Sequence, residues 1–188
     1  MQRFACELRA RVEGNTLTGY ASVFGQTAKV GGHYEAIART AFDRVLASED
    51  RTLADPRFLV NHEPSRLLGR RSAGTLRVEV DEHGLGFEVD LPDTEDGRTV
   101  RELTRRGDLD GGSFGFVPGA DEWTRAPDGL QVRMHTDVRG LLDLSVVTYP
   151  AYEGAAVVLR AQSYAVPAGR PRLIRVRHAA RYGGGQTA

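Results

Sequence analysis

Cysteine and lysine are nearly absent from this chain of 188 residues, with Cys6 and Lys29 the single examples. One cysteine excludes an intrachain disulfide and any zinc site built from cysteines. The other 24 basic residues are arginine. We attribute that preference to the coding bias of an arginine-rich genome and not to chemistry.

Long apolar segments are also missing. No run approaches the ~20 apolar residues of a membrane-spanning helix, and the first ten residues, MQRFACELRA, are charged and alternating, unlike a signal peptide. No phosphate-binding loop or dinucleotide fingerprint occurs. We expect a soluble, cytosolic protein. Its length and its apolar content of 40% suit one packed domain followed by a tail.

Acidic residues stop at Glu153, and six arginines follow. These six positive charges balance six excess negative charges earlier in the chain, so the formal net charge is zero. Proline, glycine and arginine dominate from residue 162 onward. We therefore predict a domain at 1–161 and a flexible tail at 162–188. The tail has few aromatics, so we interpret its charge as a non-specific electrostatic feature and expect no specific nucleic-acid partner.

Alternating apolar residues predict a strand-rich α+β fold, an antiparallel barrel that is closed or nearly closed, with about two helices. One helix is expected to begin at a Thr40 cap and to place Phe42, Val45 and Leu46 on one face. The other is an amphipathic segment within 93–111. Hairpins are expected at 3–25 and 74–93, and further strands at 56–64, 110–119, 130–138, 141–150 and 155–161.

Ser113 lies in an unusual strand, DGGSFGFVPG, residues 110–119. Glycines on both sides of the hydroxyl allow another backbone to come close. A serine can attack an acyl carbon when a neighbouring base takes its proton and donors receive the oxyanion. The alternative is a glycine-rich strand packed against a helix.

His62 is the histidine that best fits such a base. It ends the apolar strand in FLVNHEP, and strand ends are where a scaffold presents reactive groups. A structural role is the alternative. His83, in a hairpin turn, and His178, in the tail, are expected on the surface, and His33 in a glycine loop is left undecided.

Asp143 is a carboxylate within the apolar strand LLDLSVVTYP. Alternation places Leu141, Asp143, Ser145 and Val147 on one face. A carboxylate there needs a partner. An imidazole is one, and the acid would orient that ring; an arginine across the sheet is the other. A metal site formed by His62, His135 and carboxylates is a third reading, without ligand spacing to recommend it.

Five blocks occur in an order that resembles the prohead maturation proteases of tailed bacteriophages, serine peptidases related in fold to herpesvirus assemblin. They are GYASVFG, AFDRVL, LVNHEPSRLLGR, GGSFGF and LLDLSVVTYPAYEGAAV, and together they extend over roughly residues 3–160. The resemblance implies an assemblin-like barrel. It also implies a histidine base at His62 and a serine nucleophile at Ser113, with Asp143 at the position that is often acidic in the family.

The herpesvirus relatives use a second histidine as the third member, for which His135 would be the candidate; we prefer Asp143. Gly112 and Gly115 flank the serine and are our expectation for contacts with the oxyanion or the substrate backbone. No cofactor or metal is expected.

The resemblance also implies a role in capsid maturation. Such a protease acts inside the immature capsid in the host cytoplasm and cuts the scaffold or the N-terminal extension of the major capsid protein, and then itself. A homodimer is a further expectation, and the tail would serve as a self-cleavage segment or a capsid tether. The alternatives are a catalytically silent capsid-assembly module and a metal-dependent hydrolase.

Overall fold

The computed structural model describes residues 2–7 and 11–149, and strands make up most of this part of the chain. Two α-helices and one short 3-10 helix accompany them in these residues. The strand-rich α+β class is thereby confirmed. The strand expected at 155–161 and the tail expected at 162–188 lie outside the described residues.

A five-stranded sheet forms the base of the fold. Its order is β1-β10-β13-β6-β7, and β13 and β6 run parallel while the other neighbours are antiparallel. The parallel pair contradicts the expectation of an all-antiparallel arrangement, and residues 61–137 form the long connection that a parallel pair needs. The bounds are β1 (Gln2–Glu7), β6 (Arg57–Val60), β7 (Glu63–Arg70), β10 (Gly111–Pro118) and β13 (Val138–Val147).

A second sheet of four strands has the order β2-β3-β9-β8 and is antiparallel throughout. The hairpin expected at 74–93 is confirmed by β8 and β9. The N-terminal hairpin is confirmed only from β2 onward, because residues 2–7 pair with β10 instead. The bounds are β2 (Arg11–Glu13), β3 (Thr16–Val23), β8 (Leu76–Val80) and β9 (Gly84–Asp90).

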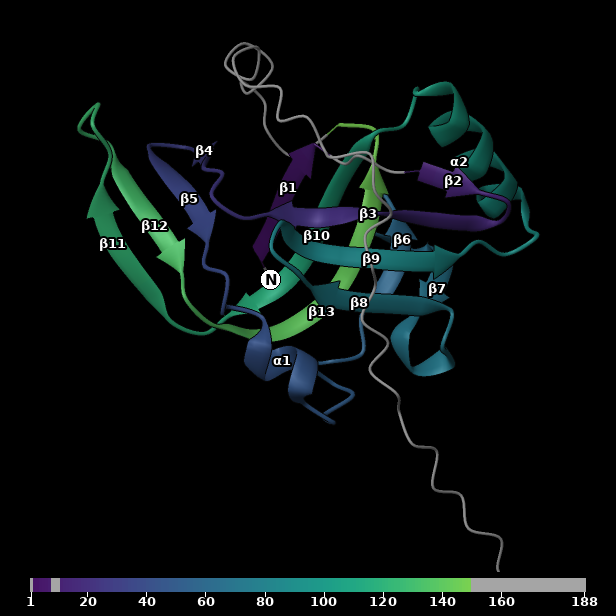
Figure 1. Cartoon of the computed structure of the whole chain (residues 1–188), viewed down its shortest axis with the longest axis horizontal. Coiled ribbons are helices and arrows are strands. Elements are labelled where there is room, and N and C mark those ends of the chain that lie inside the picture. The colour runs from purple at the N-terminus through teal and green to yellow at the C-terminus, as the bar shows by residue number, and fades with distance from the viewer. Residues whose placement is uncertain (1, 8–10, 150–188) are drawn as a thin grey trace, which may run out of the picture.

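The hydrophobic core lies between these two sheets. Figure 1 shows β3, β9 and β8 crossing in front of β10 and β13 at a steep angle. Each fully buried leucine or phenylalanine stabilises this contact by about 1.5–3 kcal/mol. The first sheet contributes Phe58, Phe114, Phe116, Leu144 and Val146, and the second contributes Leu17, Leu76, Leu85, Phe87 and Val89.

A third sheet, which we call the wing, consists of residues 28–37 and 121–135 and projects to one side (Figure 1). Its strands β4 and β5 occupy the segment expected as a glycine loop. Among the described residues the strands form three separate sheets and no closed barrel, so the expected barrel is not confirmed. The bounds are β4 (Ala28–Val30), β5 (His33–Ile37), β11 (Asp121–Arg125) and β12 (Gln131–His135).

The two α-helices differ in how well the sequence anticipates them. Helix α2 (Glu95–Arg106) is confirmed, with the Thr94 side chain accepting a hydrogen bond from the Gly97 N–H at 3.3 Å. Helix α1 (Asp43–Ala47) is short, and the expected Thr40 cap is wrong, because the capping position is Phe42 and carries no side-chain cap. The 3-10 helix is η1 (Arg71–Ala73).

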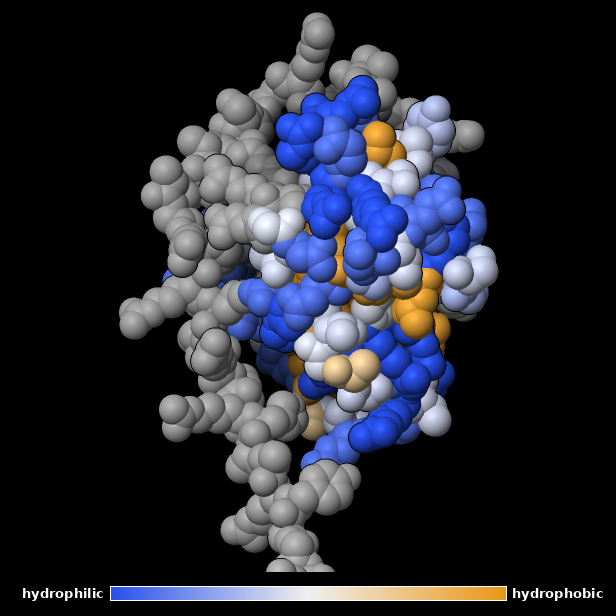
Figure 2. Space-filling model, turned by 90° about the vertical axis from the view of Figure 1, so that its right-hand side faces the viewer, coloured by the Kyte–Doolittle hydropathy of each residue, from blue (hydrophilic) through white to orange (hydrophobic). Residues whose placement is uncertain are grey.

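The side of the molecule that carries α2 is largely hydrophilic, with hydrophobic residues in small separate spots (Figure 2). This agrees with the exposed acids and arginines of α2, whose buried positions include Val100. Neither α-helix in the described residues has the length and apolar content needed to cross a membrane.

Candidate active site

Two central strands of the five-stranded sheet carry polar side chains on the face opposite the core. Phe114 of β10 and Leu144 of β13 point into the core, so their neighbours Ser113 and Asp143 point the other way. Ser113 is opposite Ser145 in the β10–β13 ladder. Ser113 is 1% exposed and Asp143 is 4% exposed. The hydroxyl and the carboxylate therefore sit on adjacent strands in a buried environment.

A β-bulge precedes Asp143 on β13. Gly115 pairs with Asp143 but the next residue, Phe116, pairs with Leu141, so Leu142 is the extra residue. Leu141 consequently joins the core, and the expectation that it shares a face with Asp143 is wrong. The bulge ends the alternation just before the carboxylate, and alternation is regular from Asp143 to Val146.

His62 lies in a two-residue turn between β6 and β7. Asn61 has φ 52° and His62 has φ 58°, both in the left-handed region that residues other than glycine rarely adopt. The turn is fastened to the end of β13. The Asn61 N–H donates to the Val146 carbonyl at 2.8 Å, and the Thr148 N–H donates to Asn61 Oδ1 at 2.9 Å. These hydrogen bonds hold the turn so that the imidazole of His62 lies over the polar side chains of β10 and β13.

The structure brings His62, Ser113 and Asp143 together. His62 Nε2 lies 2.8 Å from Ser113 Oγ, and His62 Nδ1 lies 2.5 Å from Asp143 Oδ1. The side chains of His62 and Asp143 are only 8% and 6% exposed. The partner of Asp143 is therefore the imidazole of His62. Such an arrangement can move a proton from the hydroxyl to the ring while the carboxylate stabilises the charge.

Ser145 is a neighbour of the site to which the sequence analysis gave no role. Its Oγ donates to Asp143 Oδ1 at 3.1 Å and accepts the backbone N–H of His62 at 3.2 Å. It also lies 3.2 Å from His62 Nδ1. Strand alternation placed Ser145 on the face of Asp143, and that was the available signal. The position of the His62 backbone above it was not visible in the sequence.

The two glycines expected beside the oxyanion lie on different faces of β10. Gly115 is on the face of Ser113, opposite Asp143, and Gly112 is on the core face, opposite Val146. Since β10 has a neighbour on each side, its N–H groups lie in the sheet plane and point toward β1 and β13. The oxyanion role of Gly112 and Gly115 stays a prediction.

The remaining histidines lie elsewhere. His135, the substitute third member, is in the wing, where its Nδ1 is 2.6 Å from Asp121 Oδ1 and its Nε2 is 3.6 Å from Glu35 Oε2. His33 contacts Glu35 at 3.3 Å. His83 is in the β8–β9 turn with its side chain 54% exposed, as expected, and His178 is outside the described residues. In residues 2–7 and 11–149, no cluster of three or more His, Cys, Asp or Glu side chains could hold a metal ion.

Two carboxyl groups of the wing, those of Glu35 and Asp121, have pKa values below their ordinary range. Burial alone would raise the pKa of Glu35, but the imidazoles of His135 and His33 and the guanidinium of Arg133 outweigh it and hold the pKa below its ordinary value. Burial likewise opposes ionisation of Asp121, and Arg133 and His135 lower its pKa. These groups form a buried ionic cluster apart from Ser113.

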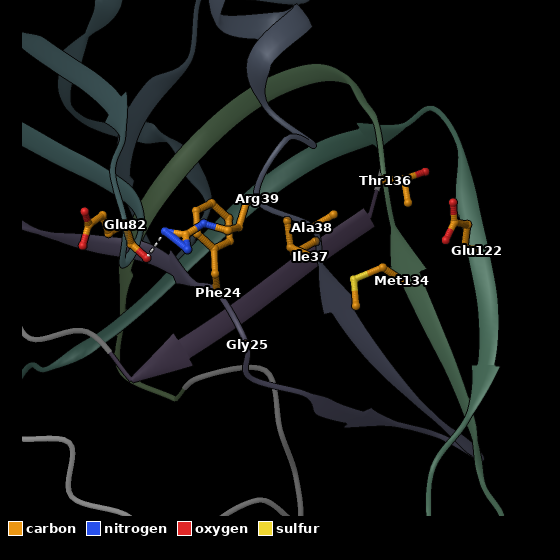
Figure 3. A pocket seen from close by; sticks show the side chains of 9 residues that line it. All are labelled: Phe24, Gly25, Ile37, Ala38, Arg39, Glu82, Glu122, Met134 and Thr136. Atoms are coloured by element: carbon orange, nitrogen blue, oxygen red, sulfur yellow. Dashed lines mark hydrogen bonds between the residues drawn. The ribbon is translucent and has the colours of Figure 1, made fainter.

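One surface pocket of about 460 Å³ lies where the wing meets the β8–β9 turn (Figure 3). At one end of it Arg39 donates to the Glu82 carbonyl at 2.6 Å and lies over the Phe24 ring. His62, Ser113 and Asp143 are not among its lining residues, so the pocket is separate from the candidate active site. Its lining consists of Phe24, Gly25, Ile37, Ala38, Arg39, Glu82, Glu122, Met134 and Thr136.

Comparison with known proteins identifies relatives over most of the chain. The profile of a family described as caudovirus prohead serine protease matches residues 4–167. The prohead protease of Enterobacteria phage HK97 is 30% identical over 141 residues, which are 74% of this chain and 57% of that protein. The chain thus spans a little over half the length of that relative. A search of the solved structures gives no significant match.

Proposed function

The chain belongs to the caudovirus prohead serine protease family, and from this premise we propose that it is a serine endopeptidase of phage capsid maturation. The observation that carries the proposal is the imidazole of His62, which touches the Ser113 hydroxyl through one nitrogen and the Asp143 carboxylate through the other. The three residues come from three separate segments of the chain. A silent assembly module has no chemical need for that convergence.

Each side chain has one role in the proposed reaction. Ser113 Oγ attacks the carbonyl carbon of the scissile peptide while its proton passes to His62 Nε2. The protonated ring then gives this proton to the leaving amine, and water repeats the sequence to release the acyl group from Ser113. Asp143 accepts the Nδ1–H of His62, which fixes the tautomer and stabilises the imidazolium.

The substrates, partners and location are proposed from the family. The substrates are the scaffold or the N-terminal extension of the major capsid protein, followed by the enzyme itself, inside the immature capsid in the host cytoplasm. We also propose an assemblin-like domain at 1–161 that acts as a homodimer, and a tail at 162–188 that self-processing removes. Gly112 and Gly115 are kept as proposed contacts to the substrate backbone or the oxyanion.

The first prediction concerns Ser113→Ala. This chain is co-expressed with the major capsid protein of the same phage, and the products are measured by intact mass. The wild type is expected to shorten the capsid protein and itself, whereas Ser113→Ala should do neither, because the methyl group removes the nucleophile without adding bulk. His62→Ala is expected to lose activity in parallel.

Other results would select other functions. If the wild type and Ser113→Ala both leave the two proteins intact, the silent assembly module is favoured. If both cut equally, Ser113 is not the nucleophile, and sensitivity to a chelator would then identify a metal-dependent hydrolase. A variant lacking residues 162–188 tests the tail, because unchanged incorporation and processing would remove its proposed role.

A further inference from the structure

A second serine, Ser145, lies between the acid and the base of the candidate site. It is 1% exposed and is opposite Ser113 across the β10–β13 ladder. On its other side it pairs with Leu59 of β6, three residues before His62. The hydroxyl of Ser145 is therefore buried at the point where β10, β13 and the end of β6 meet.

The three contacts of Ser145 Oγ fit the capacity of one hydroxyl. A hydroxyl has one proton to donate and two lone pairs. Its proton goes to Asp143 Oδ1 at 3.1 Å, and one lone pair receives the backbone N–H of His62 at 3.2 Å. His62 Nδ1 is also 3.2 Å away, but its proton is directed to Asp143 Oδ1, which is nearer at 2.5 Å.

These contacts act on the two residues whose geometry the reaction needs. His62 has a left-handed backbone, which costs roughly 1–3 kcal/mol for a residue other than glycine and persists only when its surroundings hold it. The hydrogen bond from the His62 N–H to Ser145 Oγ is one of the contacts that hold this backbone conformation. The bond to Asp143 Oδ1 fixes the carboxylate and takes up part of its negative charge.

We propose that Ser145 is a positioning residue of the peptidase, which joins the His62 backbone to the Asp143 carboxylate and sets the charge that faces the imidazole. This inference rests on the proposed function. It assigns Ser145 no bond to substrate and no part in moving the serine proton. Its effect is exerted through the two residues it contacts.

The pH dependence separates this role from a merely structural one. Without the Ser145 hydroxyl, the full charge of Asp143 faces the ring, so protonated His62 is favoured and the base becomes available only at higher pH. Ser145→Ala is therefore expected to shift the acid limb of the rate profile upward by about half to one pH unit. The rate at pH 7 is expected to fall roughly 10- to 100-fold, because the base also loses its position.

The experiment uses a fluorophosphonate that labels reactive serines, so that no peptide substrate has to be known. Ser113 Oγ attacks phosphorus, fluoride leaves, and the proton passes to His62. The labelling rate of the full chain is measured by intact mass from pH 5 to 9, with peptide mapping to Ser113. Ser145→Cys keeps the shape of the side chain with a somewhat larger atom and weakens the donor, and its labelling rate is expected to lie between those of wild type and Ser145→Ala.

Ser22→Ala is the matched control. Ser22 is on β3 in the second sheet and is 0% exposed, and within the described residues its hydroxyl has no hydrogen-bond partner. The same atom is removed from an equally buried serine without breaking a hydrogen bond. Its labelling profile is expected to match the wild type.

The outcomes differ for the two levels of inference. If Ser145→Ala labels like the wild type, or is slower by one factor at every pH with an unmoved acid limb, the positioning role is overturned and the peptidase remains. If the wild type itself is not labelled at Ser113, the proposed function fails and the role of Ser145 fails with it. If Ser145→Ala does not fold, Ser145→Cys is judged in its place. An acid limb that does not move in Ser145→Cys overturns the positioning role, and one that moves upward supports it.

Discussion

At the scale of single residues, the described part of the chain contains two short aspartate–histidine pairs in which the imidazole is buried. Asp143 and His62 are 2.5 Å apart, and Asp121 and His135 are 2.6 Å apart. The pairs differ in what faces the second ring nitrogen. His62 Nε2 faces the Ser113 hydroxyl, whereas His135 Nε2 lies 3.6 Å from the Glu35 carboxylate. Of these two pairs, only the first has a hydroxyl within hydrogen-bonding distance of its second ring nitrogen, as the proposed proton transfer requires.

Asp143→Asn is therefore expected to lower the labelling rate of Ser113, and Asp121→Asn is not. An amide at position 143 can donate to Nδ1 and favour the wrong tautomer, which should lower the labelling rate of Ser113 by roughly 10³- to 10⁴-fold. Asp121→Asn changes an equally short pair in the wing and should leave the rate near the wild type. Equal losses in the two variants, both folded by circular dichroism, would contradict the assignment of Asp143.

The sequence predicted which three residues to examine, and the structure places them in contact. Their order and residue types carried that prediction. The contact between Ser145 and His62 and the left-handed turn at Asn61 and His62 were not predictable, because they depend on where the end of β6 meets β13. That contact joins segments more than 80 residues apart, as in the bond between His62 and Ser145.

At the scale of elements, α2 contains a glycine that helix propensity alone would disfavour. Gly97 is buried, and a Cβ atom added to it would overlap the carbonyl oxygen of Pro92 and lie 3.1 Å from its carbon. The close approach lets α2 pack against the segment that precedes it. Packing rather than propensity therefore explains the residue.

Gly97→Ala is expected to destabilise the protein by roughly 1–3 kcal/mol, because backbone atoms of Pro92 would have to move. Helix propensity alone predicts the opposite, a gain of about 1 kcal/mol. The urea midpoint measures the sign directly. Gly86→Ala is the control, since its added Cβ would lie 3.6 Å from a Tyr20 ring carbon, an ordinary contact. A raised midpoint for Gly97→Ala would refute the packing explanation.

Elements with strong local patterns were predictable and those that depend on distant partners were not. The β8–β9 hairpin alternates regularly, and α2 has acids in its first turn and arginines in its last. Strands β4 and β5 surround a Gly-Gly turn, and β5 gains its second partner from β12, about 100 residues away. Local sequence contains little of that information.

At the scale of the whole molecule, the wing is stabilised by charge where the two stacked sheets are stabilised by an apolar core. Glu35 is 2% exposed and is within 4 Å of His33, Arg133 and His135. Each of these groups is positive or can become so. We therefore expect the anionic form of Glu35 to contribute to the stability of the wing.

The resulting prediction is an acid-sensitive fold. The folded pKa of Glu35 is lowered, so its contribution is complete above the unfolded value of about 4.3 and is lost as the pH falls through the folded value. Glu35→Gln should lower the free energy of unfolding, measured with urea at pH 7, by roughly 1–3 kcal/mol. The difference from wild type should shrink below about pH 4.

Glu102→Gln is the comparison for this pH series. Glu102 forms an exposed pair with Arg105 on α2, and its own side chain is 53% exposed. Loss of this pair should therefore not measurably change the free energy of unfolding. A difference between Glu35→Gln and wild type that stays constant from pH 7 to pH 3 would show that the charge of Glu35 is not the cause.

The register of three neighbouring strands also limits where insertions and deletions in this chain can be tolerated. Ser113, Ser145 and Leu59 are aligned across β10, β13 and β6. Because side chains alternate with a period of two, inserting or deleting one codon within any of these strands would turn its later side chains to the opposite face. Natural variation in length is therefore expected in the connecting loops, such as the β11–β12 turn, and not between these aligned positions.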